Sequence, residues 1–184
     1  GVKGRIFDSQ SEKTHFREHS HEMNDIVAPS IPHAERVKAC TGKCGEGLHL
    51  FTVWTTALSG WNNKYTHSID SALFHHPKGR VTVYSSSLPQ NFFQQFVDLG
   101  YDVKVEKLNM KERGKGTPLE PWVNRLDEWK DGQYYYAHLS DAVRLLVLYN
   151  EGGVYFDTDV VIVNSMDDAR NVVGWEREDS ICNA

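Results

Sequence analysis

Hydrophobic residues are unevenly spaced in the first part of the chain and become regularly patterned from residue 48 onward. Residues 1–47 are rich in His, Glu, Ser, Lys and Pro, a composition typical of segments that do not build a packed core. Beyond this segment, apolar residues recur at the spacings of strands and helices. The sequence therefore predicts a polar, stem-like lead-in over 1–47 and a globular domain over 48–184.

The patterned region alternates between short apolar runs and longer amphipathic segments. We expect strands over 48–54, 80–86 and 101–108, helices over 64–76, 89–99 and 122–129, and a Gly-, Pro- and Lys-rich loop over 111–121. Strands that alternate with helices predict an α/β fold with a mostly parallel sheet and right-handed crossovers. Ligands of such sheets bind at the carboxyl ends of the strands.

The stretch SDAVRLLVLYNEGGVYFDTDVVIV, residues 140–163, is the most informative part of the pattern. Its first half is apolar almost all round, which predicts a helix over 140–150 that is buried between other elements. Ser140 is a suitable N-cap, and Gly152 or Gly153 suits the left-handed residue that ends a helix. The apolar run that follows predicts a buried strand up to residue 163.

Two aspartates interrupt this predicted strand. Asp157 and Asp159 are two residues apart, so in an extended strand both side chains point to the same face. Two buried anions need a compensating cation, and hard carboxylate oxygens suit magnesium, calcium or manganese. The alternative is a strand that ends at Phe156 and a turn over 157–159, where aspartates are common.

A second charged pair precedes the glycines. Asp141 and Arg144 are three residues apart, so they share one face of the predicted first helical turn, near the positive end of the helix dipole. In an exposed position such a pair is an ordinary surface ion pair. On a helix this apolar, it also suits the wall of a polar cavity. A cation, a helix N-terminus and two carboxylates together indicate a site for a phosphorylated ligand.

Composition narrows the function classes. The chain has 184 residues, 40% of them hydrophobic, and a formal net charge of -5. It is long enough for a packed core and lacks the basic excess of a nucleic-acid-binding protein. No apolar run approaches the ~18 residues that a membrane-spanning helix requires. We therefore expect membrane contact only through an anchor outside this chain.

The motifs resemble those of a known family. The runs SDAVR (140–144) and YNEGGVYFDTD (149–159) are similar to the glycosyltransferases that carry a sugar-binding region with a D-x-D motif. That group includes the alpha-1,4-galactosyltransferases, the yeast initiation-specific mannosyltransferases and, more distantly, the glucosylating bacterial toxins. Weaker similarity extends to LHLFTVWT (48–55), SALFHHP (71–77), VTVYSS (81–86), and, near the C-terminus, GWE (174–176) and CNA (182–184).

This resemblance implies a Rossmann-like, GT-A type fold that is incomplete at its C-terminus, with the donor-binding part over 48–184. It implies a metal-dependent, retaining transfer of a hexose, most simply from a UDP-sugar, to a glycan, glycolipid or glycoprotein in the Golgi lumen. It assigns Mn²⁺ or Mg²⁺ to Asp157 and Asp159, with the second aspartate the more direct ligand. It places Asp141 and Arg144 toward the donor sugar and phosphate.

The resemblance also places the nucleotide base at the end of the first predicted strand. Its candidates for base binding are Phe51, Trp54 and Thr55. Trp54 could stack on the base, or it could be an ordinary core aromatic. Donor identity, acceptor and linkage are not readable from these residues.

Two other classes compete with transfer. A nucleotide-sugar-binding module without transfer activity would share the donor site but lack acceptor contacts. A metal-dependent phosphohydrolase would need further carboxylate or histidine ligands near the pair, and none stands at suitable spacing.

Other clusters carry weaker predictions. His15, His19 and His21 have spacings that a metal could use, but a structural site normally needs four well-placed ligands on a scaffold. The His-His-Pro run at 75–77 fits a helix end. Cys40 and Cys44 could form a disulfide in an oxidising compartment or remain thiols, and Cys182 would be left over.

Overall fold

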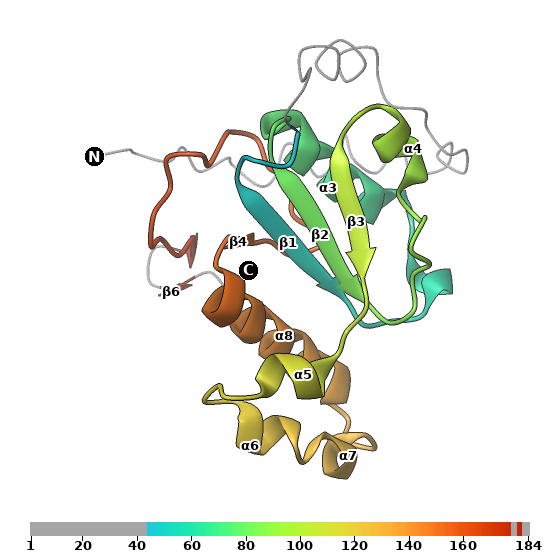
Figure 1. The fold of residues 1–184 in the computed structure, drawn as a ribbon, viewed down its shortest axis with the longest axis vertical. Coiled ribbons are helices and arrows are strands. Elements are labelled where there is room, and N and C mark those ends of the chain that lie inside the picture. The colour runs from blue at the N-terminus through green and yellow to red at the C-terminus, as the bar shows by residue number, and fades with distance from the viewer. Residues whose placement is uncertain (1–43, 178–179, 182–184) are drawn as a thin grey trace.

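The computed structural model describes residues 44–177 and 180–181 of the chain (Figure 1). Most of the predicted lead-in, the histidine cluster, two of the three cysteines and the C-terminal run 182–184 lie outside these residues. Cys44 lies inside them and is disulfide-bonded. The strands are β1 (His49–Trp54), β2 (Arg80–Ser85), β3 (Asp102–Glu106), β4 (Val154–Tyr155), β5 (Trp175–Arg177) and β6 (Ser180–Ile181).

Helices connect the strands. They are the 3-10 helix η1 (Leu58–Gly60) and the α-helices α3 (Asn63–His75), α4 (Gln94–Asp98), α5 (Met110–Gly114), α6 (Glu120–Val123), α7 (Leu126–Trp129) and α8 (Tyr135–Glu151). Four strands form one parallel sheet in the order β3-β2-β1-β4. The predicted α/β class with a parallel sheet is therefore confirmed.

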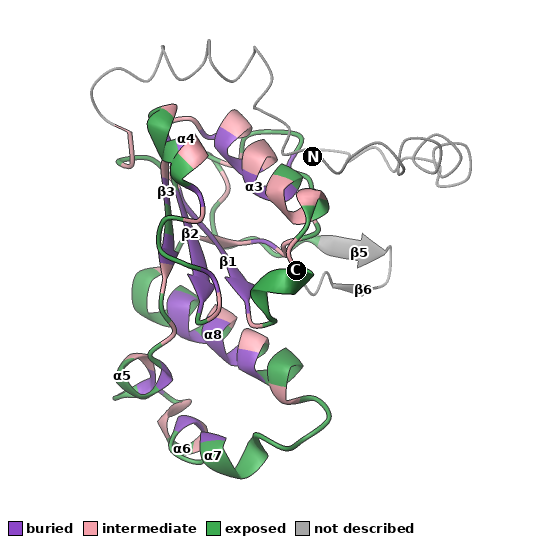
Figure 2. Cartoon of the chain, turned by 90° about the vertical axis from the view of Figure 1, so that its right-hand side faces the viewer, coloured by how far each residue is buried: buried purple, intermediate pink, exposed green. Residues whose placement is uncertain are grey.

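The sheet is covered by helices on both faces (Figure 2). Leu50 and Trp54 of β1 pack on the side of α3 and α4, whereas Phe51 and Val53 pack on the side of α8. This division follows from the alternation of side chains along a strand. Since β1 and β2 are buried on both faces, their sequences are nearly continuous apolar runs, as is typical of parallel sheets.

The two long helices match the sequence pattern to different degrees. Helix α3 begins where predicted, because the side chain of Asn62 accepts a hydrogen bond from the backbone N–H of Lys64 at its start. Helix α8 instead begins at Tyr135, so Ser140 lies inside the helix and the predicted cap is wrong. At the other end Gly152 follows the last helical residue. Its φ is positive as expected, at +69°, but its ψ of -153° lies outside the left-handed helical region.

The predicted loop over 111–121 is wrong in part, because α5 and α6 occupy most of it. Asn109 caps α5 by accepting from the backbone N–H of Glu112. Met110 and Val123 are buried in the core cluster on the α8 side. Tertiary burial therefore stabilises helices that are too short to show an apolar period. The predicted helix over 89–99 is reduced to the five residues of α4.

Gly153 makes the closest backbone approach at the entry to β4. Its φ is +97°, and a Cβ placed there would lie 2.6 Å from the backbone oxygen of His49. Gly152 also has a positive φ, but a Cβ there would have open space around it. Only glycine satisfies both constraints at Gly153.

The two glycines therefore give a matched pair of substitutions. Gly152→Ala should lower the free energy of unfolding by about 1 kcal/mol through backbone strain alone. Gly153→Ala should lower it by about 2 kcal/mol, because the neighbouring β1 backbone must also shift. Urea denaturation of both variants measures the difference. If both variants lost the same free energy of unfolding, the close contact with His49 would not contribute to stability.

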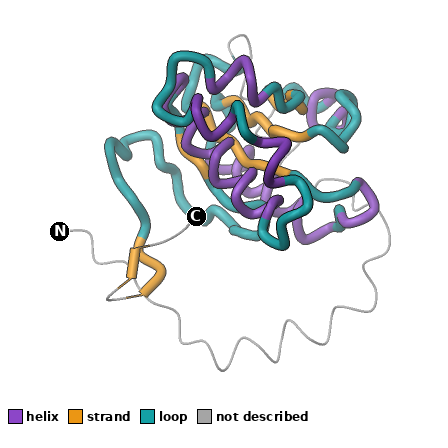
Figure 3. Tube along the Cα trace, turned by 90° about the horizontal axis from the view of Figure 1, so that it is seen from below, coloured by secondary structure: helices purple, strands orange, loops and turns teal. Residues whose placement is uncertain are grey.

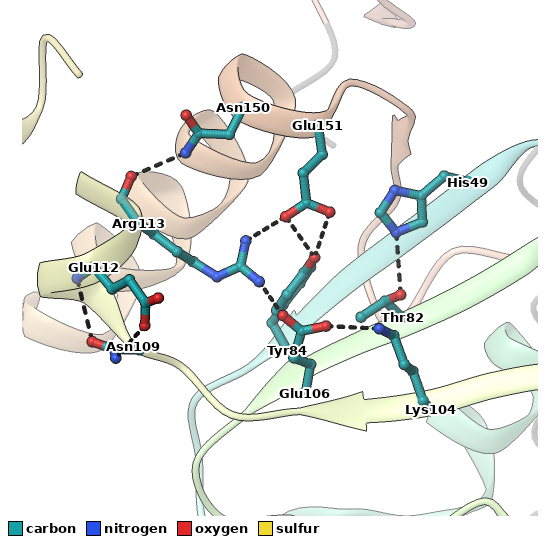
Figure 4. A network of polar contacts seen from close by, with 10 residues as sticks. All are labelled: His49, Thr82, Tyr84, Lys104, Glu106, Asn109, Glu112, Arg113, Asn150 and Glu151. Carbon is teal, nitrogen blue, oxygen red and sulfur yellow. Dashed lines mark hydrogen bonds and ion pairs between the residues drawn. The ribbon is translucent and has the colours of Figure 1, made fainter. Parts of the chain in front are cut away.

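An ion-pair cluster joins the α5 region to the sheet and to α8 (Figure 4). The guanidinium of Arg113 pairs with the carboxylates of Glu106 and Glu151, and it lies over the ring of Tyr84 at 4.4 Å. Asn150 donates to the backbone oxygen of Arg113 at 3.0 Å. Burial raises the pKa of Tyr84 to about 12, so its hydroxyl remains a neutral donor to Glu151. The cluster fixes the end of α8 just before the glycines.

The segment after β4 first packs along α3, as far as Met166, whose backbone N–H donates to His76. The chain then leaves the main body and forms the small antiparallel sheet of β5 and β6, which lies apart from the helices (Figure 3). Within the described ranges 44–177 and 180–181, no helix combines the length and apolar character needed to cross a membrane.

Candidate functional site

The two D-x-D aspartates lie in a turn, not in a strand. Strand β4 ends at Tyr155, and the backbone N–H of Val160 bonds to the oxygen of Asp157 at 3.1 Å. The prediction that Asp157 and Asp159 share one strand face is therefore wrong, and the alternative of a turn is correct. Strand β4 pairs with Leu50 and Phe51 of β1, and the chain turns directly after this short pairing.

Asp157 is held by the residue two positions before it. The hydroxyl of Tyr155 donates to Asp157 Oδ1 at 2.6 Å. Burial raises the pKa of Tyr155, and the hydrogen bond to Asp157 raises it further. The hydroxyl therefore stays protonated and remains a donor, which leaves the other oxygen of Asp157 for a ligand.

Arg144 contacts the opposite side of the same tyrosine. Its guanidinium carbon lies 4.4 Å from the centre of the Tyr155 ring, and its Nη2 pairs with Asp141 Oδ1 at 2.7 Å. The Arg144 side chain is only 17% exposed. The ordinary i,i+3 ion pair is therefore present, but its cation is half-buried and lies over an aromatic ring.

Asp141 and Arg144 do not lie in the first turn of their helix. Helix α8 begins at Tyr135, which is six residues before Asp141. The predicted contribution of the helix N-terminus is therefore wrong, because the dipole effect falls off within one turn. The positive charge at this point comes from the guanidinium of Arg144.

These contacts join three of the predicted site residues, Asp141, Arg144 and Asp157, through Tyr155. Asp141 binds Arg144, Arg144 stacks on Tyr155, and Tyr155 bonds to Asp157. Tyr155 is itself supported by the fully buried ring of Phe51, at 5.6 Å between ring centres. The two motifs SD-x-x-R and D-x-D therefore meet through one tyrosine.

A polar face of α3 holds the turn from the other side. Ser68 is fully buried, and its hydroxyl donates to the backbone oxygen of Val160 at 2.6 Å. One turn further along, Ser71 accepts from the backbone N–H of Ile162 at 3.0 Å. At the start of the helix, Lys64 Nζ lies 3.2 Å from Asp159 Oδ2. These three side chains are spaced along one face of α3.

The candidates for base binding lie on different faces of β1. Phe51 is fully buried on the α8 side, so its side chain offers no exposed surface to a ligand. Trp54 is 7% exposed on the opposite side, where its ring lies 5.0 Å from that of Trp61 and 4.8 Å from that of Tyr65. Thr55 follows the strand end and is half-buried. The indole nitrogen of Trp54 has no hydrogen-bond partner among the described residues.

The carboxylates suit a divalent cation that the substrate helps to coordinate. Asp159 is exposed. At Asp157, the turn bonds to the backbone oxygen and Tyr155 bonds to Oδ1, and neither of these contacts uses Oδ2. Within 44–177 and 180–181, no group of three or more His, Cys, Asp or Glu side chains could hold a metal alone. Mg²⁺-type ions commonly bind through one or two carboxylates together with substrate phosphates. The donor set fits such an ion.

Sequence reasoning missed Tyr155, Lys64 and Ser68. For Tyr155 a signal was present, because a residue two positions before Asp157 shares its face in an extended chain. Lys64 and Ser68 lie about ninety positions from the turn, and nothing local links them to it.

The fold and this site define an α/β protein with two charged motifs at the carboxyl edge of a parallel sheet, and comparison with known proteins gives its family. Residues 62–178 match the family described as "Glycosyltransferase sugar-binding region containing DXD motif". The match covers more than half of the chain and includes α3, α8 and both motifs. The chain therefore belongs to this family.

Individual relatives share part of the chain. An uncharacterized protein of Arabidopsis thaliana is 31% identical over 153 residues, which cover 82% of this chain and 23% of that protein. The lactosylceramide 4-alpha-galactosyltransferase of Mus musculus is 28% identical over 134 residues, covering 68% and 37%. The alpha-1,4-N-acetylglucosaminyltransferase of Homo sapiens is 32% identical over 79 residues, covering 43% and 22%. The chain spans about a quarter of the length of the Arabidopsis thaliana protein and under two fifths of the length of the Mus musculus enzyme.

Among solved structures, a chain named PaToxG Glycosyltransferase aligns with 72% of this chain and 48% of its own length. The TM-score is 0.47 and the sequence identity is 20%.

Proposed function

We propose that this chain is the donor-binding part of a glycosyltransferase that moves a hexose from a UDP-sugar to a glycan or glycolipid acceptor. The observation that carries the proposal is the chain of contacts from Asp141 through Arg144 and Tyr155 to Asp157. It places a half-buried cation beside a carboxylate at the carboxyl end of a parallel strand, where ligands of such sheets bind. Family membership supports the same assignment.

Asp157 and Asp159 would hold Mn²⁺ or Mg²⁺ in this function. The ion would supply Lewis-acid stabilisation of the negative charge that develops on a departing nucleoside diphosphate. Arg144 would add a positive contact that is already oriented by Asp141 and by the Tyr155 ring. Asp141 is exposed beside it and would orient a hydroxyl of the donor sugar. Transfer with retention at the anomeric carbon is part of the proposal and follows from the family.

The cellular setting also belongs to the proposal. The named relatives act on a glycolipid, lactosylceramide, or transfer N-acetylglucosamine. We assign this protein to the Golgi lumen on that basis, with residues 48–184 as the donor-binding part of the domain. The disulfide at Cys44 agrees with an oxidising compartment.

Calorimetry with uridine diphosphate and guanosine diphosphate, each with and without Mn²⁺, tests the donor site. We expect Mn²⁺-dependent binding of the uridine nucleotide. Metal-independent binding, or no binding of either nucleotide, would contradict the proposal. A subsequent screen for Mn²⁺-dependent hydrolysis of UDP-hexoses needs no acceptor. Binding without any hydrolysis would instead indicate a nucleotide-sugar-binding module.

Tyr155→Phe tests the link between the two motifs. The variant keeps the ring that supports Arg144 but removes the hydroxyl that donates to Asp157. We expect Mn²⁺-dependent affinity for uridine diphosphate to fall by about tenfold, since a hydrogen bond to a charged group is worth about 1.5 kcal/mol. Tyr149→Phe is the matched control, because Tyr149 lies on α8 and is 65% exposed. If both variants bound uridine diphosphate with the same affinity, Tyr155 would have no role in donor binding.

A further inference from the structure

Lys64 is the cation that contacts the second D-x-D aspartate. Its Nζ lies 3.2 Å from Asp159 Oδ2, across 95 positions of sequence. Asp157 is treated differently, because its structural partner is the neutral hydroxyl of Tyr155. The two aspartates of one motif are therefore held by chemically different groups. The hydroxyl at Asp157 is neutral, whereas the ammonium at Asp159 is positively charged, as a metal ion would be.

The position of Lys64 is determined by buried contacts, although the ion pair itself is exposed. The ammonium and the carboxylate belong to side chains that are 60% and 53% exposed. One helical turn away, the fully buried Ser68 ties α3 to the backbone oxygen of Val160. Helix α3 and the turn thus move as one unit, and Lys64 stays within reach of Asp159.

An exposed ion pair of this kind adds little to stability, so its exchange costs little. A divalent cation bound at Asp159 would take the place of the ammonium. Lysine has a flexible four-carbon stem, so the released ammonium can swing while remaining at the edge of the same site.

The charges of the site give the released lysine a role. Arg144 and a divalent ion together only balance the three carboxylates of Asp141, Asp157 and Asp159. Lys64 then supplies the excess positive charge that an anionic diphosphate needs. Resting on the function proposed above, we infer that Lys64 is a donor-binding residue: it neutralises Asp159 in the metal-free protein, and contacts the diphosphate of the donor once the metal has replaced it.

The inference predicts effects of opposite sign from one substitution. In Lys64→Gln the competing charge is absent, so Mn²⁺ alone should bind about two- to fivefold more tightly. Uridine diphosphate at saturating Mn²⁺ should bind about three- to tenfold more weakly, because a charged hydrogen bond to phosphate is lost. Isothermal titration calorimetry measures both quantities, and the thermal unfolding midpoint confirms that the exposed substitution leaves the fold intact.

Two controls complete the test. Lys64→Arg keeps the charge and should resemble the unchanged protein in both titrations. Lys130→Gln removes another exposed lysine that pairs with an aspartate, Asp127, away from the site, and should also change neither.

Each outcome decides the question. If Lys64→Gln leaves both affinities unchanged, or weakens both, the lysine is only a surface or structural partner and the inference is overturned. If the unchanged protein shows no Mn²⁺-dependent binding of uridine diphosphate, the proposed function fails first and the inference fails with it.

Discussion

Asp159→Asn is expected to reduce Mn²⁺-dependent hydrolysis of a UDP-hexose by at least about a hundredfold. The amide is nearly the same size as the carboxylate but carries no charge, so it is a poor ligand for a hard divalent ion. The fold should survive, because Asp159 is exposed and its contact with Lys64 is a surface ion pair. Initial rates over a series of Mn²⁺ concentrations measure the loss, and circular dichroism measures the fold.

The same experiment needs a control within the same segment. Asp168→Asn removes an exposed carboxylate nine residues further along and should leave hydrolysis unchanged. If Asp159→Asn retained near-normal metal-dependent turnover, the assignment of this aspartate as a metal ligand would have to be abandoned.

Arg113→Met is expected to lower the free energy of unfolding by about 3 kcal/mol. The Arg113 side chain is 13% exposed and compensates two carboxylates, Glu106 and Glu151. Without it, Glu151 would place an unpaired negative charge at the C-terminus of α8, where the helix dipole already disfavours an anion. Burial raises the pKa of Glu106, but hydrogen bonds from Lys104 and Arg113 outweigh it and hold the pKa below its ordinary value. Chemical denaturation measures the change.

Arg125→Met provides the comparison. Arg125 pairs with Glu128 three residues away, and both side chains are more than half exposed. We expect no measurable change in the unfolding midpoint, because such pairs contribute little. A loss in Arg113→Met no larger than that in Arg125→Met would mean that the cluster of Figure 4 does not stabilise the junction of α5, α8 and the sheet.

The elements that sequence patterning predicted well are those buried by the central sheet. Strands β1 and β2 are covered on both faces, so each is rich in large apolar residues over a short run that can be recognised locally. Helix α3 combines an N-cap at Asn62 with buried apolar residues on one face, and its predicted bounds are within one residue of those observed. The order of strands and helices then sufficed for the α/β class.

The errors occurred where tertiary contacts replace local preference. The apolar run over 160–163 resembles a strand, yet β4 ends before it. Ser68 and Ser71 of α3 bond to the backbone oxygen of Val160 and the backbone N–H of Ile162, so these two groups are satisfied by side chains and not by a neighbouring strand. Val161 and Val163 are consequently exposed.

The sequence by itself determined the class of fold, the two charged motifs and the glycines between them, because strand burial, helix period and residue chemistry act over a few neighbouring positions. Only the tertiary structure decided that Asp157 is held by Tyr155 and Asp159 by Lys64. It also decided that Arg144 is half-buried over the ring of the same tyrosine. The sheet order brings α3, β4 and α8 together from distant parts of the chain, and contacts between distant segments leave no local period to read.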